Sequence, residues 1–176
     1  MTLKTPLFAL TMAALGLTGG AAFAQEETTN RVASETDWSV FVESDPKECF
    51  AVSKPKQTLN TRNGQPVEVR RGKILLFVFY RPGANVSGQV TFTGGYPFAP
   101  GSTVSMQIGD SSYDLFTEGE WAWPATPGDD AKIVASMKRG ANAVLTARSA
   151  RGTQTQDTFS LLGFTASVDE AGNRCK

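Results

Sequence analysis

The chain has 176 residues, with 17 lysines and arginines against 17 aspartates and glutamates, and it contains no histidine. This balance argues against a dedicated nucleic-acid-binding protein, because such proteins need excess positive charge to neutralise phosphates. The absence of histidine excludes Ser-His and Cys-His catalysis and histidine metal sites, so we expect no catalytic residue, no metal and no cofactor.

The first 24 residues have the organisation of a cleaved signal peptide. Lys4 supplies a positive charge, residues 6–17 are mostly apolar, and Ala22-Phe23-Ala24 forms a small-residue cleavage site. We predict cleavage after Ala24. The apolar run is too short for a good membrane span, so we expect no transmembrane segment after cleavage.

The mature chain begins with a polar stretch. Residues 25–36, "QEETTNRVASET", contain almost no large apolar side chain and predict a flexible leader. Residues 37–176 are enough for a single domain with its own core. Export predicts that this domain lies in the periplasm or is secreted to the cell surface.

Most of the domain has the pattern of β-strands. "DWSVFVES" and "KILLFVFYRP" carry apolar residues on both parities, which predicts strands buried on both faces. Later segments alternate cleanly, as at Val90 and Phe92. The closing segment "DTFSLLGFTASV" predicts a last strand, with one face formed by Leu162, Phe164, Ala166 and Val168. Strands recurring between Gly- and Pro-containing turns predict an antiparallel β-sandwich.

One short α-helix is predicted over residues 129–139. Asp129 is the expected N-cap, acidic residues lie in the first turn, and Lys138 and Arg139 lie in the last. These charges complement the helix dipole, and Gly140 follows as the expected C-terminal glycine. Its apolar stripe is expected to pack on the sandwich.

The two cysteines, Cys49 and Cys175, are the only ones in the chain. An exported protein with one pair of cysteines most simply forms one intramolecular disulfide in an oxidising compartment. Two free thiols and an intermolecular bridge remain the alternatives.

The segment "LFTEGEWAWP", residues 115–124, brings together Glu118, Glu120, Trp121 and Trp123. As one extended strand it would place both tryptophans on the parity of Leu115. Two glutamates at i and i+2 point the same way and do not flank a substrate, which argues against a glycosidase pair. Two interpretations remain open: the tryptophans pack in the core, or the four residues form an exposed recognition surface.

A basic cluster precedes the strand at "KILLFVFY". In "VRRGK", Arg70, Arg71 and Lys73 form a candidate anion-binding patch for a lipid headgroup or a polysaccharide. The alternative is a solvated face without a ligand.

Four features together resemble one family. The "DWSV" opening, Cys49 soon after it, the helix "DDAKIVASMKRG" and the closing "FSLLGFTASV" are similar to the invasion associated locus B proteins, exported proteins of alphaproteobacteria. The likeness covers most of residues 37–175. It implies a β-sandwich domain in the periplasm or at the cell surface, without a defined enzymatic activity. Members often carry further cysteines near the opening tryptophan and in the middle, which this chain lacks.

These features favour an exported, non-enzymatic binding protein of the periplasm or cell envelope. Its expected partner is another envelope protein, a glycan or an anionic lipid headgroup. The alternative is a carbohydrate-binding or carbohydrate-active module that uses Trp121 and Trp123.

Overall fold

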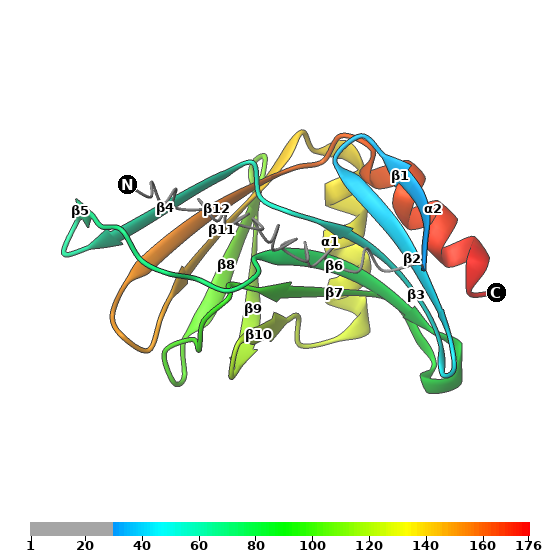
Figure 1. The fold of residues 1–176 in the computed structure, drawn as a ribbon, viewed down its shortest axis with the longest axis horizontal. Coiled ribbons are helices and arrows are strands. Elements are labelled where there is room, and N and C mark those ends of the chain that lie inside the picture. The colour runs from blue at the N-terminus through cyan, green and yellow to red at the C-terminus, as the bar shows by residue number, and fades with distance from the viewer. Residues whose placement is uncertain (1–29) are drawn as a thin grey trace, which may run out of the picture.

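The computed structural model describes residues 30–176, so the predicted signal peptide lies outside the described residues. Strands dominate the chain, with two α-helices and one short 3-10 helix (Figure 1). The elements are β1 (Arg31–Glu35), β2 (Trp38–Ser44), β3 (Lys47–Ser53), β4 (Gln57–Arg62), β5 (Gln65–Pro66), β6 (Leu75–Arg81), η1 (Pro82–Ala84), β7 (Val86–Thr93), β8 (Thr103–Ile108), β9 (Ser111–Glu118), β10 (Trp121–Trp123), α1 (Pro127–Arg139), β11 (Asn142–Arg148), β12 (Gln154–Ser160) and α2 (Phe164–Arg174).

All strands belong to one curved sheet in the order β1-β2-β3-β6-β7-β10-β9-β8-β11-β12-β4-β5 (Figure 1). Every neighbouring pair is antiparallel, which confirms the predicted mainly β, antiparallel class. The sheet is not closed, because β1 and β5 remain at its two edges. Its two halves share one core, in which Trp38 of β2 lies in the same apolar cluster as Leu145 of β11 and Phe159 of β12.

The predicted helix is α1, but it begins two residues earlier than expected, so the prediction of Asp129 as the N-cap is wrong. Thr126 is the N-cap, and its hydroxyl accepts a hydrogen bond from the backbone N–H of Asp129 (3.2 Å). The apolar stripe buries Ile133 and Met137 in the core. Asp130 is also buried, and its carboxylate accepts a hydrogen bond from the N–H of Val90 in β7 (2.8 Å). Burial raises the pKa of Asp130 above its usual value, while this hydrogen bond opposes the rise.

The predicted closing strand is wrong beyond Ser160, because the chain forms α2 instead. The buried residues of α2 are spaced by three and four, as in a helix that buries one face: Phe164, Ser167, Val168 and Ala171. The same segment also contains the alternating apolar residues from which a strand was expected. Gly163 precedes the helix at a φ of +85°, and a Cβ there would lie 1.9 Å from the carbonyl oxygen of Glu35. Only glycine therefore lets the start of α2 approach the end of β1.

The predicted leader also differs from the structure in its last part. Arg31–Glu35 form β1, which pairs with β2 despite the polar sequence of this segment. Its side chains are mostly exposed, so backbone hydrogen bonds and the contact between β1 and α2 stabilise it rather than an apolar face. Residues 25–29 lie outside the described part of the chain.

The predicted disulfide between Cys49 and Cys175 is confirmed. It joins β3 to the end of α2 across a sequence separation of 126, with a Cα–Cα distance of 5.8 Å. Both cysteines belong to a small apolar cluster with Val40 and Ala171, which is separate from the main core. The bridge thus fixes α2 where only a few apolar side chains hold it.

Residues 67–74 connect β5 to β6 as an irregular segment that crosses the sheet, here called the strap (Figure 1). Arg71 of the strap makes two hydrogen bonds to the carboxylate of Asp157 in β12 (2.8 and 2.5 Å), and these side chains are only 6% and 0% exposed. The guanidinium also donates to the carbonyl of Gly94 (2.9 Å) and the side-chain oxygen of Asn60 (3.2 Å). Burial raises the pKa of Asp157, and the Arg71 guanidinium opposes that rise.

We expect loss of the disulfide to destabilise the fold without abolishing its β-structure. Replacing Cys49 and Cys175 with alanine should lower the free energy of unfolding by about 2–5 kcal/mol, because the unfolded chain is no longer constrained over a long loop. Urea unfolding of the variant, and of the wild type with a thiol reductant, measures the change. Equal midpoints for oxidised and reduced wild type would contradict a stabilising role.

We expect Arg71→Met to destabilise the fold by about 3–5 kcal/mol at pH 7, because it leaves the Asp157 carboxylate buried without a counter-charge. Arg70→Met is the matched control, because Arg70 is the adjacent residue in the chain and its side chain is exposed. This variant should change the free energy of unfolding by less than about 0.5 kcal/mol. Denaturant unfolding measures both.

The same variant should depend on pH in a defined direction. Without Arg71, the folded-state pKa of Asp157 lies further above its unfolded value, so the folded protein takes up a proton more readily than the unfolded chain. Part of the lost stability should therefore return as the pH falls from 7 through this raised pKa. The difference in the free energy of unfolding between Arg71→Met and Arg70→Met should shrink as the pH falls. If that difference stays constant or grows, the Asp157 carboxylate is not the cause of the destabilisation.

Candidate functional site

The segment of residues 115–124 is a hairpin, not the single strand expected from the sequence. β9 ends at Glu118, β10 begins at Trp121, and Gly119 occupies the turn with a φ of +59°. In the register of this hairpin Trp121 lies opposite Glu118 and Trp123 lies opposite Phe116. Directly opposed residues project from the same face of a sheet, so both tryptophans share a face with Phe116 and not with Leu115.

The three tryptophans differ sharply in exposure. Trp38 is 1% exposed within the core, whereas Trp121 is 44% exposed and Trp123 is half-buried. Glu118 and Glu120 are both exposed, but Glu120 lies in the turn and lines a different cavity. The structure therefore brings Trp121, Trp123 and Glu118 together on one outer surface and separates Glu120 from them.

Phenylalanines from neighbouring strands continue this surface. Ring centroids lie 5.3 Å apart for Phe41 and Phe50, 5.9 Å for Phe50 and Phe77, and 6.1 Å for Phe77 and Trp121. Phe79 stacks on Phe77 at 5.0 Å. We call the whole set the aromatic face: Phe41, Phe50, Phe77, Phe79, Phe116, Trp121 and Trp123.

The aromatic face forms because β2 and β3 carry apolar side chains on both faces of the sheet. One parity, with Val40 and Ala51, points to the core clusters, and α2 covers that side of β2 and β3. The other parity carries Phe41 and Phe50, which remain partly exposed and belong to neither cluster. The expectation that both faces of "DWSVFVES" and "KILLFVFYRP" are covered is therefore wrong at Phe41 and Phe77, which remain partly exposed, while Phe79 is buried on the same face. Both helices pack on the core side.

Two hollows mark the aromatic face. One, of about 650 Å³, lies between Phe41, Phe50 and Phe77, with Lys54 and Lys73 at its rim. The other, of about 330 Å³, is lined by Phe79, Arg81, Gln89, Thr91, Trp121 and Trp123. Arg81 lies over the Phe79 ring at 4.2 Å from its centroid, pairs with Glu48 and donates to Gln89 (2.9 Å). Aromatic surface and fixed polar groups thus occur together at this end of the face.

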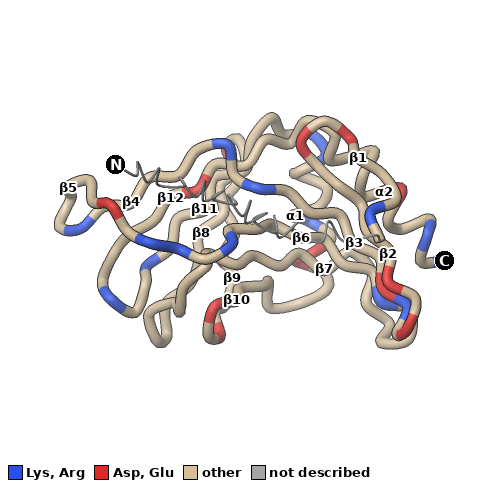
Figure 2. Tube along the Cα trace, in the orientation of Figure 1, with Lys and Arg blue, Asp and Glu red and all other residues tan. Residues whose placement is uncertain are grey.

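The predicted anion patch is not assembled as one surface. Figure 2 shows its basic residues along the strap. Arg71 is buried against Asp157 and lines a separate cavity together with Arg70, whereas Lys73 lines the larger hollow of the aromatic face. The burial of Arg71 could not be predicted from the local sequence, because its partner Asp157 lies 86 residues further along the chain.

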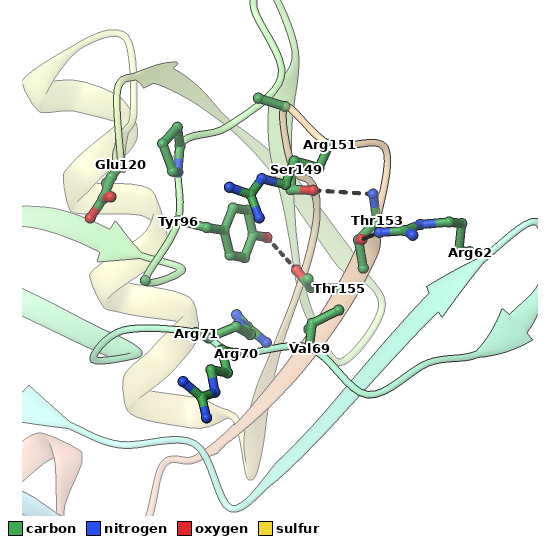
Figure 3. Close-up of a pocket in the computed structure, with 13 residues that line it drawn as sticks. Arg62, Val69, Arg70, Arg71, Tyr96, Glu120, Ser149, Arg151, Thr153 and Thr155 are labelled. Carbon is green, nitrogen blue, oxygen red and sulfur yellow. Dashed lines mark hydrogen bonds between the residues drawn. The ribbon is translucent and has the colours of Figure 1, made fainter.

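That separate cavity has a volume of about 440 Å³ and lies between the strap, β4 and the turn that joins β11 to β12 (Figure 3). Four arginines line it together with hydroxyl groups and the ring of Tyr96, and we call it the arginine pocket: Arg62, Val69, Arg70, Arg71, Gly95, Tyr96, Pro97, Glu120, Ser149, Ala150, Arg151, Thr153 and Thr155. The sequence interpretation missed Arg62 and Arg151. One sequence feature common to both could have indicated them: each arginine lies beside a glycine-containing turn, at Arg62-Asn63-Gly64 and Arg151-Gly152.

Within residues 30–176 no group of three or more acidic or cysteine side chains is placed to hold a metal ion. No helix in this part of the chain is long and apolar enough to span a membrane.

Comparisons with known proteins connect this architecture to one family. The family model described as invasion associated locus B (IalB) protein matches residues 38–172. The crystal structure of invasion associated protein B from Bartonella henselae has a similar fold, with a TM-score of 0.54 and 16% identity, over 79% of this chain and 94% of that chain. No curated protein matches this chain. The match over most of the domain shows that the chain belongs to the invasion associated locus B family.

Proposed function

We propose that this chain is an exported, non-enzymatic binding protein of the cell envelope, and that the aromatic face contacts a protein partner. Members of the family are typically exported, in keeping with the predicted signal peptide and the disulfide. The chain has no histidine, and both cysteines form the bridge, so the usual nucleophile and base pairs are missing.

The observation that carries this proposal is the extent of the aromatic face. It crosses neighbouring strands from β2 through β3, β6, β7 and β10 to β9. With about 4.8 Å between adjacent strands, these six strands extend roughly 24 Å. Soluble monomers rarely leave a contiguous apolar surface of this kind uncovered, and aromatic side chains are enriched at protein interfaces.

A protein partner fits this face better than a single sugar ring. The rings of Phe41 and Trp121 lie at opposite ends of the series of ring contacts that runs through Phe50 and Phe77, so one small ligand cannot cover both. Arg81 and Glu48 form an ion pair beside Phe79, which supplies the polar rim typical of an interface around an apolar centre.

A carbohydrate is the second candidate, and one observation favours it. The smaller hollow combines Trp121 and Trp123 with the side chains of Arg81, Gln89 and Thr91. Aromatic rings stack on the apolar faces of sugars, while amide, hydroxyl and guanidinium groups bond to sugar hydroxyls. This candidate uses one end of the aromatic face only.

Site-specific photo-crosslinking in cells that produce the full chain tests the protein partner. A photoreactive phenylalanine analogue at position 121 or 41 should give a discrete protein adduct, because both positions lie on the aromatic face. Leu162, which is 62% exposed and outside that face, is the control position. Adding Phe50→Ala should weaken the adduct at position 41. The absence of adducts from both face positions, or equal adducts from position 162, would refute the protein partner.

A glycan array with the purified mature protein tests the second candidate. If a sugar binds the smaller hollow, Trp121→Ala and Trp123→Ala should each weaken binding by about two- to tenfold, since stacking on an aromatic ring contributes about 0.5–1.5 kcal/mol. Leu59→Ala is the control, because Leu59 is 47% exposed on β4. Glycan binding that survives both tryptophan variants, or no glycan binding by the wild type, would eliminate the carbohydrate candidate.

A further inference from the structure

The arginine pocket is a second concave site, distinct from the aromatic face. None of its lining residues lines either hollow of that face. Five parts of the chain supply it: β4, the strap, the segment between β7 and β8, the turn between β9 and β10, and the turn from β11 into β12. Figure 2 shows basic residues on the strap and on that turn. The proposed protein contact on the aromatic face leaves this site without a role.

The arginines that line the pocket outnumber the acidic groups that neutralise them. Asp157 neutralises Arg71, and Glu120 is the one acidic residue among the lining residues. Arg62, Arg70 and Arg151 are exposed. Among residues 30–176, no hydrogen bond or ion pair occupies the guanidinium of Arg70 or Arg151. The lining therefore presents guanidinium groups that are free to bind an anion.

Two of these groups are directed into the pocket. The guanidinium of Arg62 donates to the hydroxyl of Thr153 (2.9 Å), which fixes its direction and leaves further N–H groups for a ligand. In Figure 3 the Arg151 guanidinium points toward Tyr96, whereas that of Arg70 points away from this ring. Arg62 and Arg151 are thus the anchoring pair, and Arg70 contributes charge at the rim.

The rest of the pocket is closely packed and partly apolar. The Tyr96 hydroxyl lies 2.5 Å from the hydroxyl of Thr155, and the Arg71 guanidinium lies 5.0 Å from the centre of the Tyr96 ring. Gly95 approaches the strap so closely that a Cβ would lie 2.7 Å from the backbone of Gly72. Val69, Pro97 and Ala150 add carbon surface. A cavity of about 440 Å³ has the size of a small-molecule site.

We propose that the arginine pocket binds a phosphate monoester, with Arg62 and Arg151 holding the phosphate oxygens and Tyr96 and Pro97 contacting the carbon body of the ligand. A phosphate monoester carries close to two negative charges and three oxygens that accept hydrogen bonds. It suits guanidinium groups that arrive from two separate elements, whereas a carboxylate offers one charge and two oxygens. The ester can belong to a soluble sugar phosphate or to a lipid headgroup.

Two binding measurements test the proposal and distinguish a soluble ligand from a lipid. Isothermal titration calorimetry measures binding of glucose 1-phosphate. Co-sedimentation measures binding to phosphatidylcholine vesicles with and without phosphatidic acid. Arg62→Met and Arg151→Met should each weaken binding by about tenfold or more, as expected for loss of a charge-assisted hydrogen bond. Arg148→Met is the matched control, because Arg148 is exposed on β11 and does not line the pocket. It should change the affinity by less than about twofold.

Binding of glucose 1-phosphate that depends on Arg62 and Arg151 supports a soluble ligand, and binding of phosphatidic acid vesicles alone with the same dependence supports a lipid. Trp121→Ala should leave either interaction unchanged, which separates this site from the aromatic face. Binding of neither probe by the wild type overturns the proposal. An equal loss in Arg148→Met and Arg151→Met also overturns it, because the attraction would then arise from general surface charge.

Discussion

The buried pair of Arg71 and Asp157 is the interaction on which the two candidate surfaces depend. Residues 67–74 form no strand, and two backbone hydrogen bonds, from Val67 to Asn60 and from Gly72 to Gly95, hold them in place. The Arg71 guanidinium adds bonds to Asp157 of β12 and to the carbonyl of Gly94. On one side, the fixed strap forms a wall of the arginine pocket. On the other, its Lys73 and Ile74 border the larger hollow of the aromatic face. One ion pair inside the fold therefore positions residues at both sites.

The sheet carries these sites because its two faces are used differently. The core side receives both helices, and Phe164 of α2 packs edge-on against Trp38 at 4.8 Å between ring centroids. The indole N–H of Trp38 donates a hydrogen bond to the carbonyl of Ser160, so the one polar group of this buried side chain has an acceptor. No described helix covers the outer side of β2, β3 and β6, which leaves the aromatic face in contact with solvent except at Phe79, which its neighbours bury. Burial is thus concentrated on one side, and the other remains available for recognition.

Local chemistry was sufficient to predict part of this structure. The charges and the terminal glycine of α1 lie within one segment, and two cysteines leave one possible internal pairing, so both predictions were correct. Helix α2 was missed because period two and period 3.6 overlap in "GFTASV", and the contact of Gly163 with Glu35 that favours the helix is tertiary. The turn at Gly119 reverses the chain between β9 and β10, so both tryptophans lie on the face opposite to the one expected for a single extended strand. Arg62, Arg151 and the partner of Arg71 depend on distant strands, which no local pattern reveals.

The position of the disulfide gives the fold a dependence on cellular redox chemistry. The cluster that holds the end of α2 contains four buried residues, of which Cys49 and Cys175 are two. In a reducing cytoplasm that cross-link is absent, and the helix end has few contacts to retain it. For the exported protein proposed above, oxidation after membrane passage would complete the domain. The β-structure would then form without the bond, and oxidation would secure the end of α2 against β3 only in the compartment to which the chain is exported.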